Sequence, residues 1–289
     1  MLPPPLPPMI AITLDDANLS DYTISYQLAA ARSIPVTSYI VTDWIGQPGK
    51  LTWDQIHTMR SSNFGIECHT KDHVNLLTLT EAELRANMTA VNTAFISAGL
   101  PPPEHHAYPY GKNSVVIQAI IADYRYSART FGNTGDPIYD YEQDINWFDL
   151  RTEDIRQTTS FETVKGWIDA AIAQDRVLIL TAHKIVEAPA STYQCPLDVY
   201  EDVLDYVAAK RDAGLIDPVT IDGLYRAMQG IRTRPATGSM TLHGETTGAT
   251  YNSTVDYVGF VWGTTRHNNP EGTAPDASGY DQYWISPVG

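Results

Sequence analysis

The chain has 289 residues, 43% of them hydrophobic, and a formal net charge of −15 at pH 7. That length fits one domain of roughly 230 residues with a small module attached. The excess of acidic side chains argues against nucleic acid or an anionic membrane as a partner, because both would be repelled. Two cysteines provide no disulfide framework, and no run of 18 or more apolar residues predicts a membrane span.

Residues 1–8 are mostly proline and predict a linker or an edge outside the folded domain. From residue 9 to residue 231, strand-like apolar runs alternate with amphipathic, helix-like stretches. The expected strands are Met9–Leu14, Pro35–Val41, Phe64–Cys68, His106–Tyr108, Tyr126–Thr130, Trp147–Leu150, Val177–Leu180 and Pro218–Thr220. The expected helices are Ser20–Arg32, Thr52–Ser61, Thr80–Ala98, Ser114–Ala122, Phe161–Gln174, Leu197–Ala213 and Asp222–Met228.

Seven or eight strand–helix units predict an α/β fold with a parallel sheet and helical crossovers. Their number favours a distorted (β/α)7–8 barrel over a doubly wound sheet, and no Gly-x-Gly-x-x-Gly follows the first strand. Barrels of this kind carry their chemistry at the carboxyl ends of the strands. We therefore expect the polar residues that follow the strands to share one site.

The composition and periodicity of the sequence change after about residue 232. Helical periodicity disappears, Gly, Thr, Ser, Asn and Tyr dominate, and runs such as Gly238–His243 and Tyr257–Trp262 resemble short strands. Residues 232–289 therefore predict a small β module.

Two strand ends carry groups suited to metal binding. Asp15 and Asp16 follow the first apolar run, and His69 and His73 have the spacing of a ligand pair at the end of the third. One carboxylate could bind a metal while the other acts as a base. Paired acids also cap helices, and two histidines also occur as unrelated surface or hydrogen-bonded residues.

Two further strand ends add a turn and a histidine. Tyr108–Gly111 reads Tyr-Pro-Tyr-Gly, a turn whose backbone N–H groups at Tyr110 and Gly111 could stabilise an oxyanion. His183 ends the apolar run that begins at Val177, and an imidazole there suits proton donation near neutral pH. A core histidine satisfied by a backbone carbonyl is the alternative.

Together these four segments resemble the motifs of the polysaccharide deacetylase family (NodB-homology domain, carbohydrate esterase family 4). Residues 13–17 read Thr-Leu-Asp-Asp-Ala where that family has Thr-Phe-Asp-Asp-Gly. Residues 69–73 fit its His-Ser/Thr-x-x-His, residues 107–111 match the Pro-Tyr-Gly of its third motif, and residues 180–183 match its apolar strand ending in histidine. The resemblance covers roughly residues 9–230.

The resemblance implies a role for each matching residue. Asp16, His69 and His73 would bind a divalent metal, most readily zinc, with cobalt or nickel as other candidates. Asp15 would be the general base, the Tyr110 N–H the oxyanion donor, and His183 the general acid. The substrate-contacting residues expected alongside them are Tyr108, Trp147, Leu180 and Thr181.

Three positions depart from the family pattern. The family's usual arginine, which steadies the base, is replaced by Ala107; its pocket leucine is replaced by Thr181; and its first-motif glycine is replaced by Ala17. We expect Arg151 to take over the role of the missing arginine, and Asp144 or Asp149 to be the partner of His183.

The activity implied by the resemblance is metal-dependent removal of N-acetyl groups from an amino-sugar polysaccharide such as chitin, peptidoglycan or poly-N-acetylglucosamine. Alternatives are a glycan-binding or attachment protein with little catalysis, and an O-acetyl (xylan) esterase. The substrate class implies an extracellular, cell-surface or virion-associated location. Residues 232–289 more loosely resemble an immunoglobulin- or fibronectin-type repeat, and the sequence does not indicate an oligomeric state.

Overall fold

The computed structural model describes residues 7–131, 138–140, 145–229, 257–262 and 282–287. By its internal contacts the chain divides into two units, residues 1–234 and 235–289, which are taken separately below. Most of the predicted proline-rich edge, and most of the predicted module at 232–289, lie outside the described residues.

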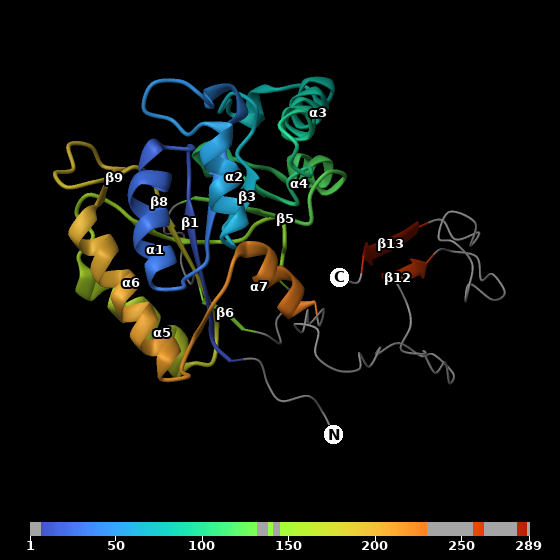
Figure 1. Ribbon diagram of the computed structural model, residues 1–289. Coiled ribbons are helices and arrows are strands. Elements are labelled where there is room, and N and C mark those ends of the chain that lie inside the picture. Colours follow the sequence, from blue (N-terminus) through green and yellow to red (C-terminus); the bar gives the residue numbers. More distant parts are fainter. Residues whose placement is uncertain (1–6, 132–137, 141–144, 230–256, 263–281, 288–289) are drawn as a thin grey trace, which may run out of the picture. The chain divides into compact units, whose positions relative to one another are not determined.

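The first unit is built on one curled sheet whose strands are mainly parallel (Figure 1). The order β5-β4-β3-β2-β1-β8 runs across it, β7 pairs with the other edge of β8, and the short strands β11 and β6 join at the starts of β1 and β8. The strands are β1 (Met9–Leu14), β2 (Val36–Ile40), β3 (Gly65–Cys68), β4 (His105–Ala107), β5 (Ser127–Arg129), β6 (Ile138–Tyr139), β7 (Glu153–Ile155), β8 (Val177–Ala182) and β11 (Asp217–Pro218).

The segment at residues 147–150 brings the two edges of the sheet together. It hydrogen-bonds to β5, with Ala128 N donating to Trp147 O at 2.7 Å and Thr130 N donating to Leu150 O at 2.7 Å. The chain then continues into β7, which pairs with β8. The sheet therefore curls into the distorted (β/α) barrel that the sequence predicts, and the fold-class prediction is confirmed.

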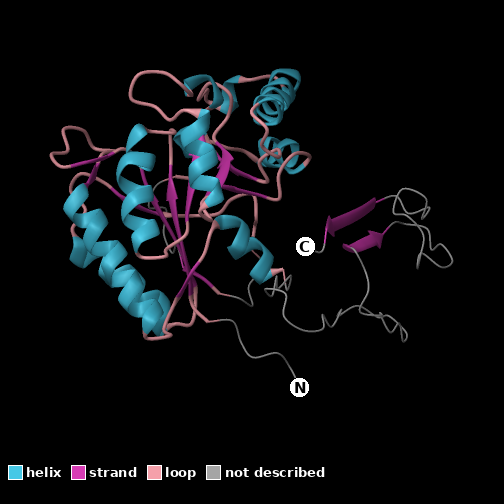
Figure 2. Ribbon diagram, in the orientation of Figure 1, coloured by secondary structure: helices cyan, strands magenta, loops and turns pink. Residues whose placement is uncertain are grey.

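Helices surround the sheet, as the colouring by secondary structure shows (Figure 2). Thr52 and Thr80 each cap the start of a helix with a complete capping box. The first predicted helix differs, because its N-terminal half is the π-helix Asp21–Tyr26. The α-helices are α1 (Gln27–Ala31), α2 (Trp53–Ser61), α3 (Glu81–Ser97), α4 (Val115–Ala122), α5 (Phe161–Ala173), α6 (Leu197–Asp212) and α7 (Ile221–Met228).

Two apolar clusters lie on the two faces of the sheet. The larger packs alternate strand residues such as Ile12 and Leu14 against the surrounding helices. The smaller lies inside the curl, where Ala11 and Tyr39 contribute together with α7. Because side chains alternate along a strand, Asp15 follows Ala11 and Thr13 on the inner face. The alternation of β1 thus delivers a carboxylate to the carboxyl end of the barrel interior.

The second unit contributes one described pair of strands. β12 (Tyr257–Trp262) and β13 (Gln282–Pro287) pair antiparallel, with Tyr257 opposite Pro287. These two strands do not establish an immunoglobulin- or fibronectin-type fold. Among the described residues, no helix is both long and apolar enough to cross a bilayer.

Candidate active site

Asp16, His69 and His73 meet at the carboxyl ends of β1 and β3. The Oδ1 atom of Asp16 lies 3.5 Å from Nε2 of His69 and 3.4 Å from Nε2 of His73. That oxygen is buried and has no hydrogen-bond partner among the described residues. Three potential ligand atoms therefore converge on one point that no protein donor fills.

The spacing of these atoms suits a divalent metal. Four ligands about 2.0–2.1 Å from a tetrahedral ion are separated from one another by about 3.4 Å, which is the separation found here. His69 Nδ1 lies 2.8 Å from the carbonyl oxygen of Ala107, so it donates there in the tautomer that leaves Nε2 free as a ligand. The three residues fit a divalent metal site.

The second group of possible ligands in the described part of the chain is already neutralised. Glu104, His105 and Asp222 gather at the amino-terminal edge of the sheet. Arg226 donates from Nε to Asp222 and from Nη2 to Glu104, both at 2.8 Å. A guanidinium thus occupies the place that a cation would take, and the site at Asp16 is the stronger metal candidate.

The charges around Asp16 and His73 support that assignment. Burial works to raise the pKa of Asp16, but the adjacent imidazole of His69 outweighs it and the pKa is lowered. Burial and the neighbouring His69 lower the pKa of His73 to about 4. The carboxylate is therefore ionised and His73 is neutral at neutral pH, which is the state in which both bind metal. Burial works to lower the pKa of His69, but the charges of Asp15 and Asp16 outweigh it and raise the pKa, so a metal binding there would displace a proton.

Asp15 lies beside this group, enclosed by two basic side chains. It is 1% exposed; Arg129 Nη2 donates to its Oδ1, and His183 Nε2 lies 3.9 Å from its Oδ2. Burial alone would raise the pKa of Asp15, but the positive charges of Arg129, His69 and His183 lower it overall. The carboxylate is held ionised, as a general base requires.

Arg129 corrects the prediction made for Arg151. Arg151 is exposed, and its backbone N–H donates to the Tyr139 hydroxyl. Arg129 is 1% exposed, and its guanidinium lies 4.5 Å over the Tyr39 ring on the way to Asp15. In the sheet, Arg129 pairs directly with Ala107, so the two side chains project on the same face of neighbouring strands. The arginine missing at position 107 is thus present one strand away.

His183 is set into a wall of aromatic rings. Its ring centroid lies 4.8 Å from that of Phe131 and 5.8 Å from that of Tyr193. Burial lowers the pKa of His183, against the raising effect of the Asp15 and Asp16 charges. The imidazole thus has an exposed neighbour in Tyr193, and Asp15 on its other side.

Asp154 is a buried acidic residue near the end of β8 that the sequence did not single out. It pairs with Thr181 across β7 and β8, it is 2% exposed, and Arg156 Nη2 donates to it at 2.8 Å. Burial raises its pKa, while the charges of Arg156, Arg129 and His183 oppose that rise. Asp149 instead accepts a hydrogen bond from Asn113, and Asp144 lies outside the described residues.

The Pro-Tyr-Gly turn lies against the metal-binding group. Tyr110 has a left-handed backbone with φ of 59°, and its ring centroid lies 4.7 Å from that of His73. Gly111 follows with φ of +64°, and a Cβ there would come within 2.7 Å of the Phe131 carbonyl oxygen. Only glycine fits that approach, which ties the turn to the end of β5.

The structure buries three of the four predicted substrate-contacting residues and leaves Trp147 half-buried. Leu180 and Thr181 are fully buried, Leu180 in the helix-facing core and Thr181 beside Thr13. Tyr108 is 1% exposed and donates to Phe148 O, while Trp147 packs edge-on against Tyr225 of α7. Strand alternation and packing thus enclose Leu180, Thr181 and Tyr108, and substrate contact by the four residues stays a prediction.

Comparison with known proteins agrees with the motifs. Residues 3–128 match the family model described as polysaccharide deacetylase. The match includes Asp15, Asp16, His69, His73 and Tyr110, and it ends before Arg129 and His183. It supports a polysaccharide deacetylase domain in this part of the chain. The Bacillus subtilis (strain 168) protein YxkH, named as a polysaccharide deacetylase, is 26% identical over 103 residues, which cover 36% of this chain and 37% of that protein.

Solved structures share the fold at low sequence identity. The Xyl-CE4 domain of a multidomain xylanase from the hindgut metagenome of Trinervitermes trinervoides aligns with a TM-score of 0.54 and 12% identity, over 78% of this chain and 92% of that one. The T48 deacetylase with substrate aligns with a TM-score of 0.52 and 15% identity, over 76% and 92%. A mutant of BA3943, described as a CE4 family pseudoenzyme with restored activity, gives 0.53 and 14%, over 76% and 68%.

Proposed function

We propose that this protein is a metal-dependent N-deacetylase that removes acetyl groups from an amino-sugar polysaccharide and releases acetate. The observation that carries the proposal is the convergence of Asp16, His69 and His73 at ligand spacing, directly beside the enclosed carboxylate of Asp15. A divalent ion held there would polarise a carbonyl and acidify a water. Zinc fits the nitrogen and oxygen donors, and cobalt or nickel would fit them as well.

The protein's own groups would handle the protons. Arg129 engages Oδ1 of Asp15 and leaves Oδ2 directed at His183, so Oδ2 would take the proton of the attacking water. The Tyr110 N–H would donate to the developing oxyanion. The proton taken from the water would then pass from Asp15 to His183 Nε2, 3.9 Å away, and His183 would deliver it to the departing amine.

Exposed aromatic rings support a carbohydrate as the substrate. Tyr110 is 58% exposed beside His73, and Tyr193 is 53% exposed beside His183. Two accessible tyrosines therefore lie on the metal side and on the acid side of the site. Amphipathic rings of this kind present an apolar face together with a polar tip, which suits the mixed surface of a sugar. The substrate class also leads us to expect an extracellular or cell-surface location.

An acetate-release assay tests the proposal across acetyl linkages. Chitin oligomers, peptidoglycan, poly-N-acetylglucosamine and acetylxylan are incubated with the zinc-loaded protein, with Asp15→Asn, and with Asp43→Asn as a control carboxylate at an exposed position. We expect acetate from at least one N-acetylated polymer, loss of about 100-fold or more in Asp15→Asn, and no loss in Asp43→Asn.

The other outcomes of that assay would overturn the proposal in distinct ways. Release from acetylxylan alone would make the protein an esterase. Binding to a polymer without acetate release by the loaded protein would make it a glycan-binding protein.

A further inference from the structure

The metal-binding residue Asp16 lies in a strained turn. Asp16 and Ala17 have φ values of 79° and 51°, two consecutive residues in the left-handed region without a glycine. Side chains with a Cβ adopt this conformation only where the surroundings impose it. The turn that presents the carboxylate therefore needs support from elsewhere in the fold.

That support comes from residues 49–51, in the long connection between β2 and α2. Leu51 N donates to Ala17 O at 3.0 Å, and Leu19 N donates to Gly49 O at 2.9 Å. Between these two bonds, Lys50 Nζ donates to Asp16 O at 2.9 Å and also to the side chain of Asn18. The Lys50 ammonium thus holds Asp16 in place through the backbone carbonyl oxygen of Asp16.

The Lys50 ammonium also packs on the ring of Trp44, which in turn packs on His73, the other proposed ligand that comes from a loop. Lys50 Nζ lies 4.1 Å from the centroid of the Trp44 ring. The Trp44 ring in turn stacks on the His73 ring, with centroids 5.0 Å apart and planes inclined by 29°. His73 also has a left-handed backbone, with φ of 58°. Its imidazole is therefore held by packing as well as by its backbone.

We propose that Lys50 and Trp44 form a clamp that holds Asp16 and His73 at ligand spacing in the metal-free protein. This inference rests on the metal site proposed above. His69 needs no such help, because it is buried and anchored on Ala107 O. A preformed site binds its ion more tightly because the ordering of the ligands is paid for during folding. Lys50 and Trp44 are thus positioning residues for the two ligands that come from loops.

The Lys50→Met variant distinguishes the clamp from a purely electrostatic effect of Lys50, because the two predict changes in metal affinity of opposite direction. Lys50→Met deletes a positive charge close to Asp16, and Coulomb repulsion alone predicts that a divalent cation then binds more tightly. The clamp predicts the opposite, because Asp16 O and the Trp44 ring lose their common partner. The direction of the change in affinity therefore decides between them.

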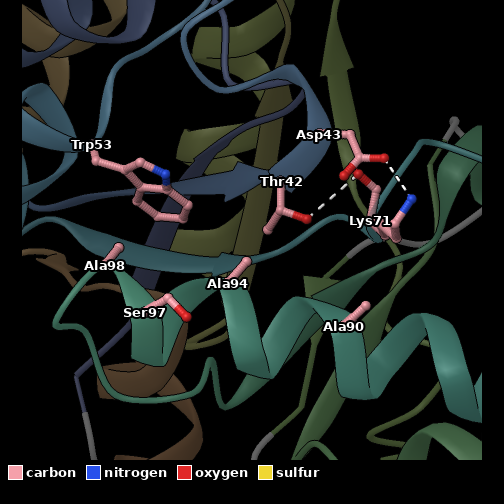
Figure 3. A pocket seen from close by; sticks show the side chains of 8 residues that line it. All are labelled: Thr42, Asp43, Trp53, Lys71, Ala90, Ala94, Ser97 and Ala98. Carbon is pink, nitrogen blue, oxygen red and sulfur yellow. Dashed lines mark hydrogen bonds and ion pairs between the residues drawn. The ribbon is translucent and has the colours of Figure 1, made fainter.

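Matched controls lie on the outer side of the same region. Lys71 is paired with Asp43 at 2.6 Å, with both side chains exposed to solvent. Trp53 lines a cavity of about 300 Å³ against small residues of α3, with Lys71 at its far side (Figure 3). Lys71→Met repeats the change of charge, and Trp53→Leu repeats the loss of an indole, without touching the clamp.

The test is the dissociation constant for Zn²⁺, measured on the full metal-free chain by competition with a chromogenic chelator. We expect Lys50→Met and Trp44→Leu to bind about tenfold or more weakly, Trp44→Phe to stay close to wild type, and both controls to change little. Circular dichroism of each metal-free variant identifies those that remain folded, and Trp44→Leu decides the matter if Lys50→Met does not fold.

Each remaining outcome has one meaning. Unchanged or tighter binding by folded Lys50→Met or Trp44→Leu would overturn the clamp and leave the proposed function standing. A wild-type protein that binds no divalent metal would overturn the proposed metal-dependent function itself.

Discussion

At the scale of single residues, the position of Arg129 is the clearest departure from expectation. Its guanidinium is buried against Asp15, and deleting it would leave an uncompensated buried carboxylate at a cost of roughly 3–5 kcal/mol. Arg129→Lys keeps the charge but loses the planar fork of donors. It is therefore the milder probe of how Asp15 is oriented.

We expect Arg129→Lys to lower kcat for acetate release by about 10- to 100-fold, with a smaller change in KM, because misplacing a catalytic group by about 1 Å costs this much. Arg151→Lys is the matched control, and it should retain activity because that side chain is exposed and the structure gives it no contact with Asp15. Steady-state kinetics on one N-acetylated oligomer measure both variants. An equal loss in Arg151→Lys would return the role to Arg151.

Arg151 was a reasonable expectation, and its failure shows what sequence patterns leave out. The strand ends at Asp15, His69, Tyr110 and His183 could be placed from alternation and turn residues alone. Which arginine reaches Asp15 depends on the neighbours of each strand and on their register. The sequence does not show that residues 147–150 pair beside β5, or that Arg129 lies opposite Ala107.

At the scale of elements, β7 carries two adjacent acids in different surroundings. Asp154 is paired with Arg156, whereas Oε2 of Glu153 is buried and has no hydrogen-bond partner in the described part of the chain. Burial, with a contribution from the charge of Asp154, raises the pKa of Glu153 to about 7. The free energy of unfolding should therefore depend on pH through Glu153.

The sign follows from comparing the folded and unfolded states. In the unfolded chain Glu153 ionises near its ordinary value, and in the folded protein only near 7. The stabilising effect of the protonated form is therefore complete below about pH 4.5 and is lost as the pH rises through 7. We expect Glu153→Gln to gain stability relative to wild type over this interval, by up to about 3 kcal/mol.

Urea unfolding of both metal-free proteins at intervals between pH 4.5 and 8 measures that difference. The glutamine also lacks a hydrogen-bond partner, but that cost is the same at every pH. It therefore does not alter how the difference in unfolding free energy changes with pH. A difference between the two proteins that stays constant with pH would show that Glu153 is not buried as the structure has it.

The same scale explains why two of the predicted substrate-contacting residues are buried. The apolar run Val177–Leu180 was correctly predicted to be a strand, which in the structure extends to Ala182. Its burial on both faces encloses Leu180 and Thr181 completely. Proximity to His183 in sequence therefore does not mean exposure at the site, where the accessible rings are those of Tyr110 and Tyr193.

For the whole molecule, the architecture was predictable and the site only in part. Alternating strands and helices predict a parallel barrel, and the barrel brings the strand ends together. The residues that position each proposed ligand could not be predicted from the sequence. They lie in connections such as residues 44–51, and the path of such a connection is set by packing. The chain has a net charge of −15, and within its described part no arginine or lysine neutralises the proposed cation site at Asp16.

The most direct test of the proposed metal-dependent activity is a zinc titration of acetate release. The protein is stripped with a chelator, dialysed, and assayed on an N-acetylated oligomer while Zn²⁺ is added back, beside His69→Ala and the control His57→Ala, whose exposed ring bonds Ala98 O. We predict no acetate from the stripped protein, activity rising to a plateau near one equivalent of zinc per chain for wild type and His57→Ala, and none for His69→Ala. Undiminished acetate release by the stripped protein, or by His69→Ala, would contradict the account.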